Sequence, residues 1–463
     1  MRSISILLLA AGLPAAAEPD WSKLDAETLR HFQALVQIDT QDPPGFEAPA
    51  VDYLKKALEA EGIPVKVFAK EPKRPNLVAR LKGNGSKKPL LIMGHTDVVN
   101  VDPTKWPTFG PFSAAREGGY VYGRGTIDDK DNLTASLMTI LALKRSGVPL
   151  ARDVIFLAES GEEGNTAVGI AYMVQNHWSE IEAEYCLAEG GSVVQRDGKI
   201  VSMNVATTEK VPSRANLVVK GTAGHGSVPL ADNAIARLSL AVANAAAWQT
   251  PMKLNDTTRA YFERLAAISS PEAAARYNGL LHPDRSAAAQ EYLRRHEPAH
   301  YSMLRTSISP TIIKAGYRVN VIPAQAEATL DIRAVPDENL DEFFAALKTA
   351  IGVEGVDIVR ASRDRDPLPP SRIDNEAFKV LESLQKRIYP GAATLPSMLT
   401  GATDMAFLRR RGVQCYGIGP LIDAADAQKG FGAHSDQERI LEKELYRFTR
   451  FHYEAAAELA RAR

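Results

Sequence analysis

Three glutamates follow a stretch of apolar residues in the segment AESGEEGN, residues 158–165. The residues before them, DVIFLA at 153–158, predict a buried strand, so the acids stand where a core strand ends. Adjacent carboxylates repel each other, and burying them without a partner is costly. The pair Glu162 and Glu163 therefore indicates either a solvated turn or a site for a cation.

Other acids and two histidines occupy comparable positions. GHTDVV places His95 and Asp97 after a predicted strand, and YCLAEGG places Glu189 after another. Asp128 stands between a glycine-rich turn and a predicted helix, and His434 lies in a loop before the final helix. For any one acid, a helix cap or a solvated turn explains the position equally well. Together they favour one shared site, because open α/β sheets bind ligands beyond the carboxyl ends of their strands.

The donor types in this set favour particular metals. Imidazole and carboxylate donors without a thiolate suit Zn²⁺, with Co²⁺ or Mn²⁺ as substitutes, better than they suit a structural site made of cysteines. The chain has only two cysteines, Cys186 and Cys415, and both lie in apolar, strand-like segments. We interpret them as buried and unpaired. An exporting compartment would permit a disulfide, so the sequence leaves their pairing open.

The elements that would position these residues alternate along the chain. Strand-like runs and amphipathic helices follow each other up to about residue 211, and one helix is expected over residues 130–146 with Gly147 to end it. This alternation predicts an α/β fold with a mainly parallel sheet. At 463 residues the chain is too long for one compact core, so we expect more than one domain.

A different pattern begins near Val211. Strand and helix signals follow there in the order β-α-β-β-α-β, which can form a domain of its own, and they are interrupted by a polar, largely helical insertion at about 250–301. We expect a catalytic domain built from residues 18–211 and 366–463, with the smaller domain inserted at 212–365. The helical insertion is expected to be a lid or an interface element.

The ordered motifs resemble those of the aminoacylase–carboxypeptidase family of co-catalytic zinc hydrolases, which includes succinyl-diaminopimelate desuccinylase, glutamate carboxypeptidase and carboxypeptidase S. The matching stretches between residues 94 and 438 are GHTDVV, YGRGTIDDK, GEEG, LAEGG, GTAGHGSVP, NVIPAQAEATLDIR, GATD and GAHSDQE. WPTFGPFSAAREGGYVYGRG leans towards the carboxypeptidase S-like branch. The resemblance implies a di-zinc hydrolase domain, an inserted lid and dimerisation domain, and a homodimer.

The resemblance also implies a role for each metal ligand. His95 and Glu189 would bind one zinc ion, Glu163 and His434 would bind the other, and Asp128 would bridge the two. Two dications ~3.5–4 Å apart need such a bridging carboxylate to offset their repulsion.

Catalytic roles follow from the same resemblance. Glu162 would be the general base that deprotonates the attacking water and passes the proton to the leaving nitrogen. Asp97 matches the acid that orients the imidazole of His95. His225, in GTAGHGSVP, matches a histidine that reaches the active site of the partner subunit and stabilises the oxyanion. Positions that hold a substrate carboxylate correspond to Asn320, Arg333, Thr400 and Gly401, although Arg333 could equally pair with a neighbouring acid.

One motif departs from the family pattern. Many members read Asp-x-Lys-Gly-Gly after the glycine turn, whereas this chain reads DDKDN, with Asp131 and Asn132 in place of the two glycines. Asp131 could favour the N-terminus of the following helix. The ligand position Asp128 is intact, so the departure concerns the shape of the pocket near this turn.

The N-terminal segment has the layout of a secretory signal peptide. Arg2 precedes an apolar stretch at 4–13, and the small residues Ala15 and Ala17 come next. A buried first helix is the alternative, but the apolar run is short. We expect a signal peptide at 1–17 and an exported protein, periplasmic or secreted. No later segment has the ~20 uninterrupted apolar residues of a membrane span.

The composition narrows the class of function. The chain is 45% apolar and 24% charged with a net charge of −1, which gives no electrostatic attraction for nucleic acid. We expect an exported zinc-dependent hydrolase that cleaves amide bonds of peptides, of the carboxypeptidase or dipeptidase type. Hydrolysis of N-acyl amino acids, as by aminoacylases, is the close alternative. A non-catalytic binding protein on the same fold is the alternative from another class, and the intact Glu162 argues against it.

Overall fold

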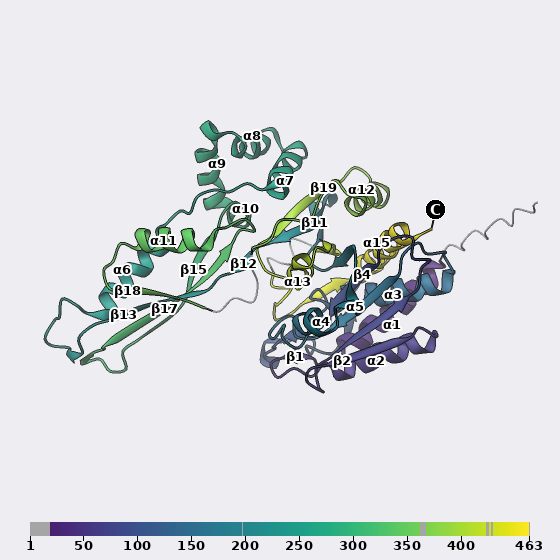
Figure 1. The fold of residues 1–463 in the computed structure, drawn as a ribbon, viewed down its shortest axis with the longest axis horizontal. Coiled ribbons are helices and arrows are strands. Elements are labelled where there is room, and N and C mark those ends of the chain that lie inside the picture. The colour runs from purple at the N-terminus through teal and green to yellow at the C-terminus, as the bar shows by residue number, and fades with distance from the viewer. Residues whose placement is uncertain (1–18, 197, 362–366, 423–425, 427–428, 463) are drawn as a thin grey trace, which may run out of the picture.

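The computed structural model describes residues 19–462, apart from 197, 362–366, 423–425 and 427–428. The expected signal peptide at 1–17 and the expected domain boundary at 365 and 366 lie outside these residues. Figure 1 shows a large body that contains both ends of the described chain and a smaller, elongated body beside it.

A ten-stranded sheet forms the core of the large body. Its strand order is β2-β3-β8-β4-β9-β20-β11-β10-β21, with β19 beside β11. The central strands β8, β4, β9 and β20 are parallel, whereas β2 and β3 at one end and the neighbours of β11 are partly antiparallel. The expected α/β fold is confirmed, with a sheet that is parallel at its centre and mixed towards its edges. The strands are β2 (Val65–Ala69), β3 (Pro75–Leu81), β4 (Leu90–His95), β8 (Val154–Glu159), β9 (Tyr185–Ala188), β10 (Ser192–Arg196), β11 (Lys199–Glu209), β19 (Ala393–Leu399), β20 (Gln414–Gly417) and β21 (Leu421–Ile422).

Helices cover both faces of this sheet. Successive side chains of a strand point to opposite faces, so one strand packs against both helical layers. In β8, Val154 and Phe156 pack on one helical layer, whereas Ile155 and Leu157 pack on the other. Helix α3 spans the expected residues, and Gly147 ends it in the left-handed conformation with a φ of 60°. The first layer holds α1 (Trp21–Val36), α2 (Ala48–Ala60), α3 (Lys130–Ser146), α12 (Glu376–Ile388) and α15 (Glu442–Ala460), and the second holds α4 (Ile170–Asn176), α5 (Trp178–Ile181) and α13 (Met405–Arg410).

The small body is built on an antiparallel five-stranded sheet. Two helices pack on it through apolar side chains such as Leu238 and Leu347. Along the chain these elements follow the expected order β-α-β-β-α-β: β13 (Ala215–Lys220), α6 (Ala234–Ala247), β15 (Ser307–Ala315), β17 (Gln325–Ala334), α11 (Leu340–Ile351) and β18 (Val356–Arg360), with the short β12 (Val211–Pro212) beside β17.

The insertion between α6 and β15 is helical, as expected. Its helices are α7 (Asp256–Ala267), α8 (Pro271–Leu280), α9 (Pro283–His296) and α10 (Pro298–Met303). Phe262 and Leu265 of α7 pack with Leu395 and Met398 of β19, so the insertion rests on the large body, as Figure 1 also shows.

Three small sheets complete the described fold. One pairs β1 (Gln41–Asp42) with β5 (Val98–Val99), and a two-stranded ribbon pairs β14 (Gly224–His225) with β16 (Val321–Ile322). The third has β7 (Tyr120–Tyr122) between β22 (Arg439–Leu441) and β6 (Ala115–Glu117). Cys186 and Cys415 are buried free thiols on the neighbouring strands β9 and β20.

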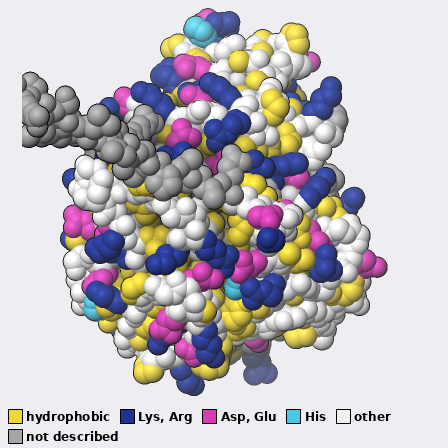
Figure 2. Space-filling model, turned by 90° about the vertical axis from the view of Figure 1, so that its right-hand side faces the viewer, with side chains coloured by type: hydrophobic (Ala, Val, Ile, Leu, Met, Phe, Trp, Pro, Cys, Tyr) yellow, Lys and Arg dark blue, Asp and Glu magenta, His cyan; other side chains and the backbone are white. Residues whose placement is uncertain are grey.

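Within the described ranges, no helix has the length and apolar character needed to cross a membrane. Figure 2 shows acidic and basic side chains interspersed on the visible face of the large body.

Candidate metal centre

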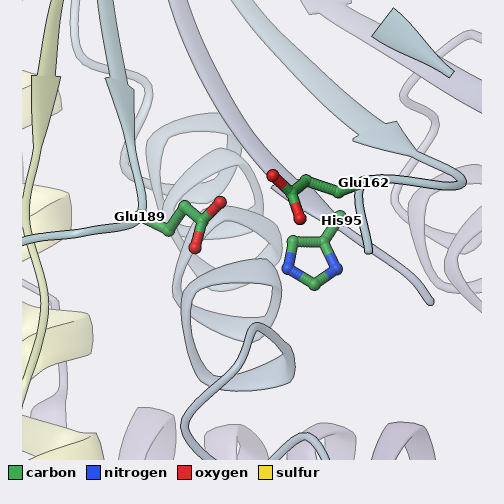
Figure 3. A group of neighbouring side chains, drawn as sticks. All are labelled: His95, Glu162 and Glu189. Atoms are coloured by element: carbon green, nitrogen blue, oxygen red, sulfur yellow. The ribbon is translucent and has the colours of Figure 1, made fainter. Parts of the chain in front are cut away.

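The carboxyl ends of three parallel strands of the large sheet bring the site residues together. Of these strands, β4 lies between β8 and β9. His95 is the last residue of β4, Glu162 and Glu163 lie in the turn after β8, and Glu189 directly follows β9. Figure 3 shows the carboxylates of Glu162 and Glu189 directed into the space beside the imidazole of His95. The structure thus brings together acids and a histidine from three separate segments of the chain.

Asp128 lies between two histidines. Its Oδ1 is 3.0 Å from Nε2 of His95, and its Oδ2 is 3.1 Å from Nε2 of His434. The same nitrogen of His434 is 2.9 Å from Oε1 of Glu163. A carboxylate that turns one oxygen towards each of two imidazoles has the arrangement of a bridging ligand.

The pairing of β22 with β7 brings the loop of His434 to the turn that carries Asp128. Glu438, just before β22, accepts hydrogen bonds from the backbone N–H groups of Ile127 at 2.7 Å and Asp128 at 3.2 Å. Its other oxygen is 2.7 Å from Nη1 of Arg124, and both side chains are buried. This buried ion pair fixes the backbone on which Asp128 stands.

Asp97 holds the turn of the two glutamates. Its carboxylate accepts hydrogen bonds from the N–H groups of Gly161 at 2.8 Å, Glu162 at 3.2 Å and Glu163 at 3.0 Å. Its backbone carbonyl is 3.0 Å from Nδ1 of His95, and its Oδ1 is 3.5 Å away from the same atom. Burial opposes its ionisation, but these hydrogen bonds hold the pKa of Asp97 below its ordinary value. Asp97 therefore positions the glutamate backbone as well as the imidazole.

A second group of acids near this turn is paired with an arginine. Asp42 and Glu47 lie close to Asp97, and Nη2 of Arg74 is 2.6 Å from a carboxylate oxygen of each. All four side chains are buried. The guanidinium occupies the place that a cation would take, so we interpret this group as a support for the turn.

The acids around the metal ligands repel one another. Burial and the negative charge of Asp404 raise the pKa of Glu162 well above its ordinary value. Burial and the charge of Glu162 do the same to the pKa of Glu189. A site with this excess of negative charge favours a dication.

The two histidines respond to the same charge. Hydrogen bonds to Asp128 and Glu163 raise the pKa of His434 to about 10. Burial alone would lower the pKa of His95, but hydrogen bonds to Asp128 and Asp97 raise it well above its ordinary value. Protons on these imidazoles offset part of the negative charge, and a metal ion bound in their place would also do so.

Besides the group of Asp42, Glu47 and Asp97, two groups of donor atoms are compact enough to hold an ion. One group is His95, Glu162 and Glu189, the other is His95, Asp128 and Glu163, and in each the donor atoms lie within 4.8 Å of one another. Nitrogen and carboxylate donors of this kind fit Zn²⁺. Glu162 therefore lies close enough to contact an ion held by the first group, although the sequence predicted it as the general base and not as a ligand.

Two of the other predicted residues lie at the ribbon of β14 and β16, His225 in β14 and Asn320 directly before β16. His225 is exposed, and its Nδ1 is 2.7 Å from Oγ of Ser227. Asn320 is also exposed, and its carbonyl accepts a hydrogen bond from the N–H of Gly226 at 2.9 Å. Among the described residues, no hydrogen bond or ion pair joins His225 or Asn320 to the metal ligands.

The remaining predicted residues lie nearer to the junction of the two bodies. Arg333, on β17, binds Asp331 with Nε 3.0 Å from Oδ1, which is the acid pairing that the sequence left open. Thr400 and Gly401 are exposed and directly follow β19. Nearby, Thr403 binds both oxygens of the buried Glu209, which fixes the loop that begins at Thr400.

Sequence reasoning missed the side chains that hold the ligands in place. Asp129 accepts a hydrogen bond from the N–H of His95 at 3.1 Å, and burial raises its pKa to about 7. Arg124 and Glu438 position Asp128, as described above. All three residues lie within the motifs YGRGTIDDK and GAHSDQE. Their closeness in the sequence to the predicted ligands could have indicated this supporting role.

These features define a class of protein. An α/β sheet that gathers two imidazoles and several carboxylates at the carboxyl ends of its strands is typical of a metal-dependent hydrolase. Residues 91–458 match the model of peptidase family M20/M25/M40, and the chain belongs to this family. It is accordingly a hydrolase of amide bonds.

Individual relatives agree with this assignment. The chain is 28% identical over 396 residues to "Probable carboxypeptidase S-like 2" of Dictyostelium discoideum, covering 82% of this chain and 73% of the relative. It is 29% identical over 357 residues to the human N-fatty-acyl-amino acid synthase/hydrolase PM20D1, covering 73% and 67%. Its fold resembles that of the M20 metallo-carboxypeptidase Sso-CP2 from Sulfolobus solfataricus, with a TM-score of 0.70, 20% identity, and coverage of 93% and 98%.

Proposed function

We propose that the protein is a two-zinc hydrolase that removes a residue from the C-terminal end of a peptide or dipeptide. The observation that carries the proposal is the carboxylate of Asp128, which turns one oxygen towards His95 and the other towards His434. His95 and Glu189 would hold one ion, with Asp128 shared between the two. Glu163, which lies beside His434, would complete the second site.

The proposed reaction assigns separate tasks to the neighbouring glutamates. Bound zinc ions would polarise the amide carbonyl and activate water near neutral pH. Glu162 takes a proton from the attacking water and delivers it to the amide nitrogen as the carbon–nitrogen bond breaks. Asp97 keeps Glu162 and Glu163 in place, because it binds the backbone N–H groups of both. Asn320, Arg333, Thr400 and Gly401 are proposed to receive the carboxylate of the substrate.

Hydrolysis of N-acyl amino acids is a second candidate, because the human relative named above is an N-fatty-acyl-amino acid synthase/hydrolase. Zinc-loaded protein should be assayed with dipeptides, C-terminally amidated dipeptides and N-acyl amino acids, with chelated protein as the control. The proposal expects rapid release of free amino acids from dipeptides, little from the amidated forms and none after chelation. Turnover of N-acyl amino acids alone would favour the second candidate.

We also propose that the small body forms a homodimer. Ile312 and Ile313 on β15 are 50% and 59% exposed, and Leu240 on α6 is 54% exposed. Exposed apolar side chains on neighbouring elements are typical of an interface. Ile313→Asp should give monomers in light scattering after size-exclusion chromatography, whereas Val67→Asp, which changes an exposed valine on β2, should not. A wild-type protein that is monomeric at assay concentration would contradict the proposal.

Export is proposed from the N-terminal pattern, with cleavage after Ala17. Expression of the full-length chain in a bacterium should give a periplasmic protein whose first residue is Glu18. A product that keeps Met1 and stays in the cytoplasm would contradict export without affecting the proposed chemistry.

A further inference from the structure

A cavity of about 260 Å³ opens beside the candidate metal ligands. Its walls are the first turn of α3, the segment 189–192 that follows β9, and the segment that follows β20, including Ile418 and Ile422. Asp128 and Glu189 form the wall nearest to the metal centre. A substrate group that occupies the cavity would therefore lie next to the metal centre.

Two buried side-chain oxygens, on residues that line this cavity, have no hydrogen-bond partner among the described residues. Asp131 is 1% exposed, and its Oδ1 makes no hydrogen bond within the described part of the chain. Asn132 is 2% exposed, and its Nδ2 donates to the carbonyl of Met93 and to Asp129, which leaves its Oδ1 as an acceptor without a donor. Buried acceptors are costly to leave unpaired, so this pair of oxygens favours an occupant that donates hydrogen bonds.

The charges around the cavity also favour an occupant that donates hydrogen bonds. Of its four acids, Asp128 and Glu189 are assigned to zinc, and Asp129 accepts hydrogen bonds from His95 and Asn132. Asp131 is left as the acid of this group that is not assigned to zinc and whose Oδ1 has no hydrogen-bond partner among the described residues. No lysine or arginine is among the described residues that line the cavity. A positively charged donor would complement this wall.

An acid in the first turn of a helix can also act alone, because it stabilises the helix dipole. That role alone predicts that binding does not depend on the charge of the substrate. The burial of Asp131 and its place on the cavity wall distinguish the two interpretations.

We infer that this cavity binds an ammonium or guanidinium group on the acyl side of the scissile amide bond, and that Asp131 determines this specificity. The inference rests on the proposed function, which places the substrate carboxylate towards Arg333 and Thr400 and so leaves the cavity to the acyl side. The cation can be the side chain of the residue before the bond or the free amino terminus of a dipeptide. Both present the same chemistry to Asp131 and Asn132.

Binding tests this without relying on turnover. Zinc-loaded Glu162→Gln protein, in which cleavage is suppressed, is titrated by calorimetry with Lys-Ala, N-acetyl-Lys-Ala, Ala-Ala, N-acetyl-Ala-Ala and decanoyl-Ala. We expect at least one cationic peptide to bind about tenfold or more tightly than N-acetyl-Ala-Ala, as a charged hydrogen bond in a buried site implies. Tight binding of N-acetyl-Lys-Ala assigns the cation to the side chain, and tight binding of Ala-Ala assigns it to the amino terminus.

Variants then identify the residue responsible. Adding Asp131→Asn, which keeps the shape of the side chain, should reduce the preference for the cation to about one, and Asp131→Ser should do the same. Asp436→Asn removes a negative charge from an exposed position near His434 and should leave the preference unchanged. Metal content and melting temperature should match those of the parent protein in all three.

Two results would overturn the inference. One is equal dissociation constants, or no measurable binding, for the cationic and neutral peptides. The other is tighter binding of decanoyl-Ala than of any cationic peptide, unchanged by Asp131→Asn. Loss of the proposed function would look different: wild-type zinc-loaded protein would fail to cleave any peptide while the preference of the Glu162→Gln protein for cations and its dependence on Asp131 persisted.

Discussion

The metal centre and the ribbon of β14 and β16 differ in how firmly each holds its side chains. At the metal centre, one carboxylate of Asp97 accepts three backbone N–H groups, and Glu438 accepts two more while it pairs with Arg124. On the ribbon, His225 is exposed, and the hydrogen bonds of its ring are to Ser227, two residues away.

The difference lies in how many contacts within one chain fix each region. The metal ligands are held in place by one subunit alone, so their geometry does not depend on assembly. His225 lies in a ribbon that pairs two residues of each strand, and Asn320, just before β16, accepts a hydrogen bond from the N–H of Gly226. If they take part in catalysis, something outside the described subunit must fix them, and a second copy of the chain is the proposed source.

The largest effect is expected from Glu162→Gln. The amide keeps the shape of the side chain but cannot accept the proton of the attacking water, so kcat should fall by about 10²–10⁴ or more. Steady-state assays measure the loss, and elemental analysis should find the metal content of the wild type.

The matched control is Glu163→Gln, which makes the same chemical change at the neighbouring glutamate. It removes a donor that lies 2.9 Å from His434, so we expect it to lose one of the two metal ions together with activity. Equal metal loss in both variants would contradict the division of tasks between the two glutamates.

His225→Ala should have the next largest effect. An oxyanion donor contributes about 10²–10³ in rate, so kcat should fall by this factor while the metal content stays unchanged. Co-expression with His95→Ala should restore part of the activity, because a hybrid dimer contains one site with both an intact metal centre and an intact His225. Verified hybrid dimers that remain inactive would exclude action across the dimer.

The support beneath Asp128 is tested by Arg124→Met. This change leaves the buried Glu438 without its cation, so the free energy of unfolding of the chelated protein should fall by about 3–5 kcal/mol. Arg360→Met, in the small body, removes a pairing with Asp341 at an exposed position and should cost about 0–1 kcal/mol. Similar losses in the two urea titrations would contradict the expected difference between the buried and the exposed ion pair.

A smaller, pH-dependent effect is expected from His452. It is buried against α3, with Nδ1 2.8 Å from Oγ1 of Thr139, and burial lowers its pKa to about 3. Below its unfolded pKa of about 6.5, the unfolded chain binds a proton that the folded chain does not, so stability falls as the pH drops from about 6.5 to 3.

His452→Gln should remove this contribution, which is at most about 1.4 kcal/mol per pH unit. Unfolding measured from pH 7.5 to 4.5 should therefore give a shallower loss of stability in the variant. His296→Gln, which changes an exposed histidine on α9, should follow the wild-type curve. Parallel curves for wild type and His452→Gln would contradict the assigned cause.

The central strands were predictable because their apolar residues form short, uninterrupted runs. β4 and β8 are buried along their whole length, as parallel strands covered on both faces must be. β19 escaped prediction because Pro396 interrupts its pattern, and proline is confined to edge strands. β19 pairs only with β11 among the described residues, so the proline is accommodated.

The candidate site was predictable to a similar degree. His95, Glu162 and Glu189 follow neighbouring parallel strands, so the sequence rule for strand ends brings them together. The approach of His434 depends on a three-residue pairing of β22 with β7, which has no periodic signal. The sequence grouped His434 with the other donors, and the family resemblance supplied its role as a ligand of the second ion. The unpartnered oxygen of Asp131 could not be predicted at all, because it depends on how three separate segments enclose a cavity.

The most direct test of the account is the number of metal ions in active protein. Elemental analysis should be carried out on purified protein that has been dialysed until free metal is absent and then assayed for dipeptide hydrolysis. The arrangement of Asp128 between His95 and His434 predicts two ions per chain, with activity lost as the second is removed by chelation. One tightly bound ion per chain with full activity would contradict the two-metal centre.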